Sequence, residues 1–158
     1  EKKLLNPIEV LSLTVMINFI AQNEKTKILN KLNEILFHKK YSILSKDLFL
    51  NTYIYVKVAK EYGILSRNDD VIIFCQKGIE LLEKNYSYFN LKYFYYYLAL
   101  AYRNKNNFEQ SHFYVSKLNN VLSFLNNPSD TEKFNALIVK DFGYSIDYIS
   151  NKYLKLHE

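Results

Sequence analysis

Residues 92–102 read KYFYYYLALAY, and the interpretation of this stretch decides the fold. Every position from 93 to 97 is aromatic, a run that could belong to a buried strand, a helical core or the lining of a groove. One face of an α-helix carries apolar residues at spacings of three, four and seven. This spacing is met by Tyr95, Leu98, Ala99 and Tyr102. The stretch therefore predicts a helix with one face in the core and the remaining aromatic residues on other faces.

The same pattern occurs 40 residues earlier in the chain. Its members there are Tyr55, Val58, Ala59 and Tyr62. Each copy is followed by a polar turn and a second apolar segment, SRNDDVIIFCQKGIELLEK at 66–84 and KNNFEQSHFYVSKLNNVL at 105–122. A small residue is expected where the two helices of a pair come closest, and Ala59 and Ala99 hold that place, with Gly78 able to do so on the second helix. The sequence thus predicts a repeated helix–turn–helix unit.

This unit resembles the tetratricopeptide repeat (TPR), a helix–turn–helix of about 34 residues. The tightest correspondence covers 92–125, residues 52–82 correspond less fully, and 7–38 and 129–156 correspond only in helix lengths and spacing. The signature places of the tightest copy hold Tyr95, Leu98, Ala99, Tyr102, Phe108 and Ser111. The resemblance implies an all-α fold, a right-handed superhelix of about four antiparallel helix pairs. An irregular helical bundle is the alternative.

Helix start and stop signals recur about every twenty residues. Asn6–Pro7 is typical of a helix start, Gly63 is expected to close the third helix, Asn107 with Glu109 to start the sixth, and Ser129 with Glu132 to form a capping box. The predicted helices cover residues 7–22, 24–37, 45–62, 68–84, 90–104, 107–126, 129–142 and 144–156. Short turns between them predict that consecutive helices run antiparallel.

Composition limits the class of protein. The 158 residues are 49% hydrophobic and include only 3 Gly and 2 Pro, which excludes a disordered chain and disfavours a many-stranded one. The net charge of +5 permits an acidic partner, but no stripe of Lys and Arg predicts direct nucleic-acid binding. The single cysteine, Cys75, excludes an internal disulfide and favours a reducing cytoplasm. The longest apolar stretch, residues 7–21, is too short to span a membrane.

The sequence carries no recognisable catalytic pattern. His38, His112 and His157 have no metal-ligand spacing to each other or to Cys75, and glycines scattered singly cannot form a phosphate-binding loop. We therefore expect no enzyme activity, no metal and no cofactor.

The concave surface of a TPR array is lined by the first helix of each pair. On that reading Tyr93, Tyr96, Leu100 and Arg103 point towards the groove, and Tyr95 into the core. Tyrosine and arginine are frequent anchors in binding surfaces, and lysine or arginine can hold a carboxylate. The remaining groove candidates are Tyr53, Lys57, Lys60, Tyr97 and Asn104. The alternative is that these tyrosines pack on the next repeat and the lysines are only solvated.

Three segments together resemble the C-terminal half of the Rgg, PlcR and PrgX type of bacterial transcriptional regulators. They are LNTYIYVKVAKEYGILSRNDDVIIFCQKGIELLEKN at 50–85, YFYYYLALAYRNKNNFEQSHFYVSKLNNVL at 93–122 and TEKFNALIVKDF at 131–142. The resemblance implies a cytoplasmic homodimer that binds a short signalling peptide, and contact with DNA only through a helix-turn-helix domain on the N-terminal side. Because the chain begins at Glu1, we expect residues 1–158 to be one domain of a longer protein.

In that family asparagines and basic residues of the groove hold the peptide backbone and carboxylate. The resemblance makes Lys57, Lys60, Arg103, Asn104 and Asn135 the candidates here, by residue type and helix position. A general TPR scaffold that docks another protein is the alternative function.

Overall fold

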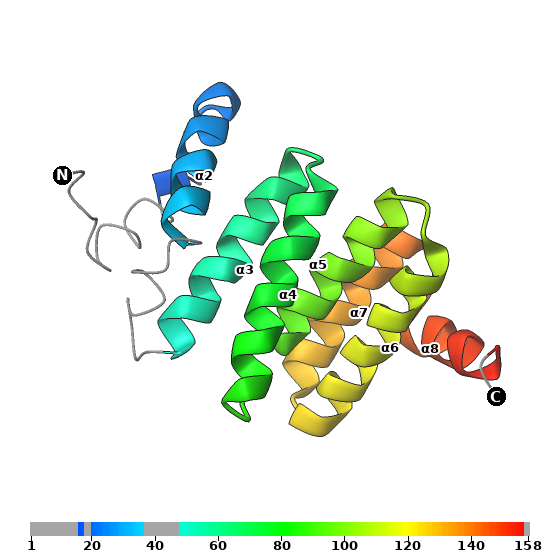
Figure 1. Ribbon diagram of the computed structural model, residues 1–158. Coiled ribbons are helices and arrows are strands. Elements are labelled where there is room, and N and C mark those ends of the chain that lie inside the picture. The colour runs from blue at the N-terminus through cyan, green and yellow to red at the C-terminus, as the bar shows by residue number, and fades with distance from the viewer. Residues whose placement is uncertain (1–15, 18–19, 37–47, 157–158) are drawn as a thin grey trace.

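The computed structural model describes residues 16–17, 20–36 and 48–156, and the secondary structure of this part of the chain is entirely helical (Figure 1). The helices are α2 (Gln22–Leu36), α3 (Leu48–Ile64), α4 (Asn68–Lys84), α5 (Leu91–Asn104), α6 (Phe108–Leu125), α7 (Pro128–Phe142) and α8 (Ile146–Lys155). The prediction of an all-α fold is confirmed for these residues. Most of the helix predicted over 7–22 (residues 7–15 and 18–19) and the first residues of the one predicted over 45–62 lie outside the described residues.

Four helix ends are built alike and are spaced twenty residues apart. Each has a left-handed residue just past the helix: Ser66, Tyr86, Asn106 and Asn126. At the first, the amide of Arg67 donates to the carbonyl of Tyr62 at 2.9 Å, the bond that closes a helix against a left-handed residue. The sequence predicts that Gly63 closes the third helix, but α3 continues to Ile64. The regular spacing of these turns is the structural counterpart of the 40-residue offset.

The helix starts confirm one predicted cap and correct another. Asn107 caps α6, its side-chain oxygen accepting from the amide of Gln110 at 3.1 Å. The capping box predicted at Ser129 is wrong, because Asn127 caps α7 and Pro128 occupies the first helical position. Proline has no amide hydrogen to leave unpaired there and its φ angle already suits a helix, so it fixes the start two residues earlier.

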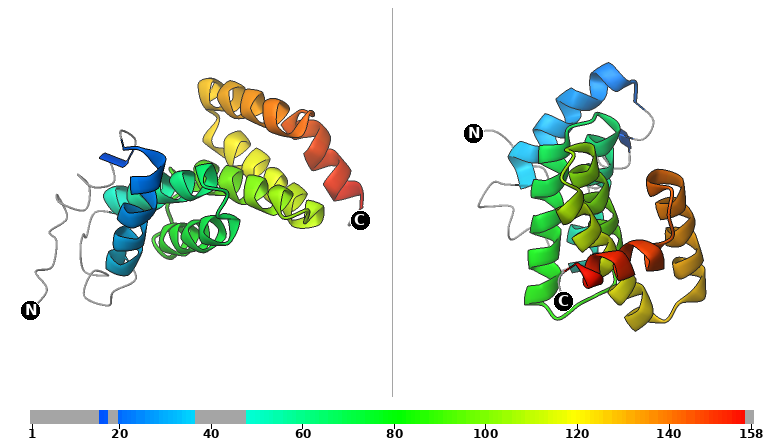
Figure 2. Two further views of the ribbon diagram at one scale, coloured as in Figure 1. Left: turned by 90° about the horizontal axis from the view of Figure 1, so that it is seen from above. Right: turned by 90° about the vertical axis from the view of Figure 1, so that its right-hand side faces the viewer.

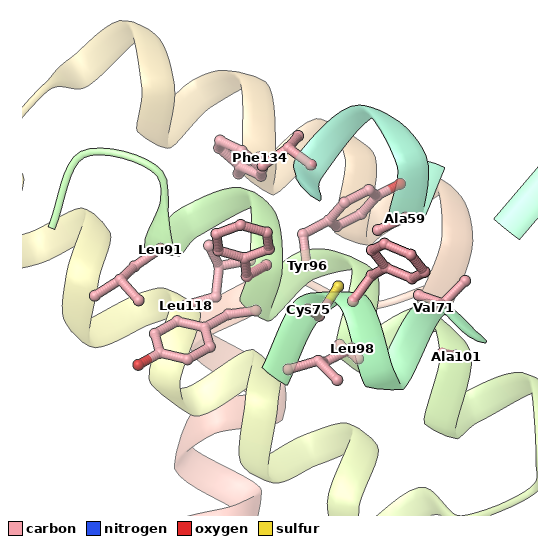
Figure 3. Packing of buried hydrophobic residues seen from close by; sticks show 14 of the residues in the cluster. Ala59, Val71, Cys75, Leu91, Tyr96, Leu98, Ala101, Leu118 and Phe134 are labelled. Atoms are coloured by element: carbon pink, nitrogen blue, oxygen red, sulfur yellow. The ribbon is translucent and has the colours of Figure 1, made fainter. Parts of the chain in front are cut away.

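Two antiparallel pairs, α3 with α4 and α5 with α6, stack through the contact of α4 with α5. Ala59 and Ala99 are fully buried in this core (Figure 3 shows Ala59). Gly78 serves a different contact from the one expected: a β-carbon on it would lie 2.1 Å from Cζ of Phe94, so it faces α5 and not α3. The absence of a side chain at Gly78 is therefore what lets one pair approach the next.

The last two helices do not form a third antiparallel pair, contrary to the expectation for 129–156. Figure 2 shows α8 continuing away from the end of α7 and packing across α6. The turn consists of Gly143, with φ of 80°, Tyr144 and Ser145, and the last of these caps α8. Asn135 accepts a hydrogen bond from the amide of Ile146 at 3.2 Å and so ties the start of α8 to α7. A turn this short cannot bring α8 back along α7, and its apolar residues pack on α6 instead.

Side-chain contacts hold α2 and α7 to the stack. On one side, Lys25 pairs with the buried Glu61 at 2.7 Å and the hydroxyl of Tyr62 donates to the carbonyl of Leu29. On the other, α7 lies beside α5, where Lys92 pairs with Asp130 at 2.5 Å. In the described residues, no helix is long and apolar enough to cross a lipid bilayer.

Candidate peptide-binding groove

A groove of about 630 Å³ lies between α3, α5 and α7. Each of the three helices is the first helix of a successive 40-residue unit, and α7 packs beside α5. The same position of each unit therefore faces the groove. The lining residues are Phe49, Tyr53, Val56, Lys57, Lys60, Phe89, Asn90, Lys92, Tyr93, Tyr96, Tyr97, Lys133, Phe134 and Leu137. The groove is therefore mostly aromatic and aliphatic, the composition usual for a site that binds an apolar ligand.

The aromatic residues of the groove pack against one another. The rings of Phe49 and Phe89 stack at one end with centroids 5.3 Å apart. Tyr93 and Tyr96 each meet Phe134 of α7 edge to face, at 5.3 and 5.9 Å. Such ring pairs hold their members in fixed positions, so the groove presents a preformed apolar wall.

The charge of the groove has one sign. Four lysines line it, and among the described lining residues none is acidic. Lys92 is neutralised by Asp130 from outside the lining. In the described part of the chain, Lys57, Lys60 and Lys133 have no carboxylate partner; Lys57 lies over the ring of Tyr53 and Lys133 over that of Tyr93. The ammonium group of Lys133 also donates to the hydroxyl of Tyr93 at 3.4 Å. An anionic group entering the groove would therefore meet three ammonium groups that no described carboxylate neutralises.

A smaller hollow of about 200 Å³ extends the groove along α3 and α5. Lys60 and Tyr97 line both spaces, so the two are neighbours along α3 and α5. The extension is lined further by Leu100 and Asn104. An extended ligand could therefore follow both helices past Lys60.

The structure brings together eight of the ten residues expected at the site. Six line the main groove and two its extension: Tyr53, Lys57, Lys60, Tyr93, Tyr96 and Tyr97, then Leu100 and Asn104. The other two are engaged elsewhere. Arg103 lies over the ring of Phe142, and Asn135 receives the amide of Ile146 at the start of α8.

The amide side chains that line the groove and its extension are already hydrogen-bonded. Asn104 donates to Asn68 at 3.3 Å, and Asn90, which lines the main groove, donates to the hydroxyl of Thr52 at 2.8 Å. A ligand in the groove would therefore contact lysine ammonium groups and aromatic rings more readily than an unbonded amide side chain.

The expected division between a core Tyr95 and a groove Tyr96 needs correction. Tyr95 and Tyr96 are each 8% exposed. Tyr96 is buried because α7 covers it. The hydroxyl of Tyr96 donates to Oδ2 of Asp141 at 2.6 Å, and burial together with this bond raises its pKa above the usual value. Burial also raises the pKa of Tyr95, to about 12. Tyr96 is thus a structural wall of the groove, and its removal is expected to affect stability as well as binding.

Several lining residues were missed in the sequence, although the 40-residue offset points to them. That offset relates Phe49 to Phe89, and it relates Tyr53 to Tyr93 and then to Lys133. All five line the groove. Extending the offset one unit further along the chain would have identified the contribution of α7.

Other reactive side chains give no support to catalysis. Cys75 is fully buried, and burial raises the pKa of its thiol, which leaves it in the unreactive protonated form. The described residues contain no group of His, Cys, Asp and Glu side chains that could hold a metal ion.

No family model, no curated protein and no solved structure matches the chain.

Proposed function

We propose that the chain binds a short, extended apolar peptide in the groove between α3, α5 and α7, with a carboxylate of the peptide held by lysines. The observation that carries the proposal is an aromatic lining that holds Lys57, Lys60 and Lys133 and, among its described residues, no carboxylate. A hydrogen bond to a charged group contributes about 1.5–3 kcal/mol to binding. Burial of apolar peptide side chains against the aromatic lining adds to this free energy.

We also propose that the stacked pairs are a TPR-like array and that the chain is the ligand-sensing and dimerisation domain of a cytoplasmic helix-turn-helix regulator. The 40-residue repeat, the stacking of α3–α4 on α5–α6 and the position of the groove on the first helix of each unit support an array. The regulatory role is what the resemblance of the segments 50–85, 93–122 and 131–142 implies. A general docking scaffold is the second candidate, favoured by the open extension of the groove towards Asn104.

The first test is a selection from a pool of peptides. The probe is a set of N-acetylated heptapeptides rich in Leu, Ile and Phe with free C-terminal carboxylates, and retained peptides are identified by mass spectrometry. We expect retention of an apolar subset and at least a tenfold loss for Lys57→Gln with Lys60→Gln, as expected when charged hydrogen bonds are lost. Lys140→Gln, on the exposed part of α7, is the matched control. Equal retention by the double variant and wild type would refute the assignment.

A further inference from the structure

A second hollow, of about 350 Å³, lies between the α4–α5 turn and α6. Its apolar lining includes Leu91, Tyr95 and Val121, all buried or nearly so. Two aromatic side chains line it while remaining largely open to solvent: Phe124 is 70% exposed and Tyr86 is 88% exposed. A projecting ring and an apolar hollow therefore stand side by side on one face of the molecule.

Tyr86 occupies a backbone conformation that does not suit it. Its φ angle is 52°, in the left-handed region, where bulky side chains are uncommon and strained. The equivalent turn positions hold Ser66, Asn106 and Asn126, which are smaller and more tolerant of that conformation. Because the ring of Tyr86 is almost fully exposed, packing within the chain does not offset the strain. A contact outside the chain would account for a tyrosine at this position.

The same hollow carries one charge of each sign. Glu83 lines it from α4 and Lys117 from α6. Within the described part of the chain neither has an oppositely charged partner, and Lys117 lies over the ring of Phe113. In a contact between two copies related by a two-fold axis, if one residue of the first copy meets a second residue of the other copy, the reverse contact also forms. Such an axis can place Glu83 of each copy against Lys117 of the other.

We propose that this face binds a second copy of the chain, with Tyr86 of each copy seated in the hollow of the other and Glu83 paired with Lys117 across the axis. A single surface that holds both a projection and a recess, and both signs of charge, is self-complementary. This assigns a surface to the dimerisation that forms part of the proposed function, and it is separate from the groove between α3, α5 and α7.

The first test measures self-association of the full chain by sedimentation equilibrium, with Tyr86→Asn as the variant and Tyr144→Ala, an exposed tyrosine in the α7–α8 turn, as the control. Asparagine suits the left-handed position, so Tyr86→Asn is expected to raise the melting temperature of the monomer while weakening the dimer roughly 30-fold, as for a central anchor residue. A wild-type chain that stays monomeric at millimolar concentration would overturn the proposal, as would a dimer that Tyr86→Asn leaves intact.

The second test exchanges the charges. Glu83→Lys alone and Lys117→Glu alone place like charges across the axis, so each variant is expected to be monomeric. An equimolar mixture of the two variants restores both pairs and is expected to form a heterodimer, which also shows that each variant is folded. Failure of the mixture to associate overturns the two-fold pairing. Peptide retention by these variants stays at the wild-type level if the groove functions independently, so loss of the dimer and loss of the groove are distinguishable.

Discussion

The substitution Gly78→Ala tests the packing that brings the two helix pairs together. A β-carbon at Gly78 would lie 2.1 Å from Cζ of Phe94 and 2.5 Å from each Cε atom. Phe94 is fully buried, so its ring cannot move aside without displacing its neighbours. Overpacking of a core costs about 1–3 kcal/mol. This contact belongs at the upper end of that range.

The helix propensity of alanine works in the opposite direction, by about 1 kcal/mol. We therefore expect Gly78→Ala to lower the free energy of unfolding by about 2 kcal/mol, measured by urea denaturation followed by circular dichroism. Gly63→Ala is the matched control, because its β-carbon would come no closer than 3.8 Å to another side chain, Cγ2 of Val71. That control is expected to gain about 0.5–1 kcal/mol. A Gly78→Ala protein as stable as the Gly63→Ala protein would show that α4 and α5 do not meet at Gly78.

Two further predictions concern pH. Because burial and the bond to Asp141 raise the pKa of Tyr96, its contribution to stability is present below pH of about 10 and is lost as the pH rises above that value. Tyr96→Phe is expected to cost about 1–2 kcal/mol at neutral pH and to flatten the alkaline fall in melting temperature; an unchanged alkaline slope would argue against the bond. Burial, and secondarily Lys152, lower the pKa of His112, so the stability it contributes is present above pH of about 6.5 and is lost as the pH falls below it. His112→Gln should flatten the acid side of a melting profile between about pH 7 and pH 5, and a steeper acid side would contradict this cause.

The helices could be predicted closely from the sequence because their signals are local. Apolar spacing on α5 and the polar turns around Ser66 and Asn106 are read within one or two turns of the chain. The 40-residue offset likewise reflects residues that repeat in sequence and lie in equivalent places, such as Phe49 and Phe89. These features do not depend on how distant segments meet.

Two errors, at Gly63 and Ser129, displaced a helix end by two residues, and the larger errors arose where a distant contact decides the outcome. Spacing alone cannot show that α8 packs on α6, since this depends on the short turn at Gly143 and on the bond from Ile146 to Asn135. Spacing also cannot show that α7 lies over Tyr96, which buries this predicted groove residue. Asn135 was expected at the site for its residue type, but its oxygen serves the start of α8.

Calorimetric titration with one retained peptide tests directly whether lysines of the groove hold the carboxylate of an apolar peptide. The peptide is compared with its C-terminal amide, which differs only in the charge at that end. We expect wild type to bind the free acid at least tenfold more tightly than the amide, and we expect Lys57→Gln with Lys60→Gln, which leaves only Lys133, to lose most of this preference. Equal affinity of wild type for the acid and the amide would contradict this role of the lysines.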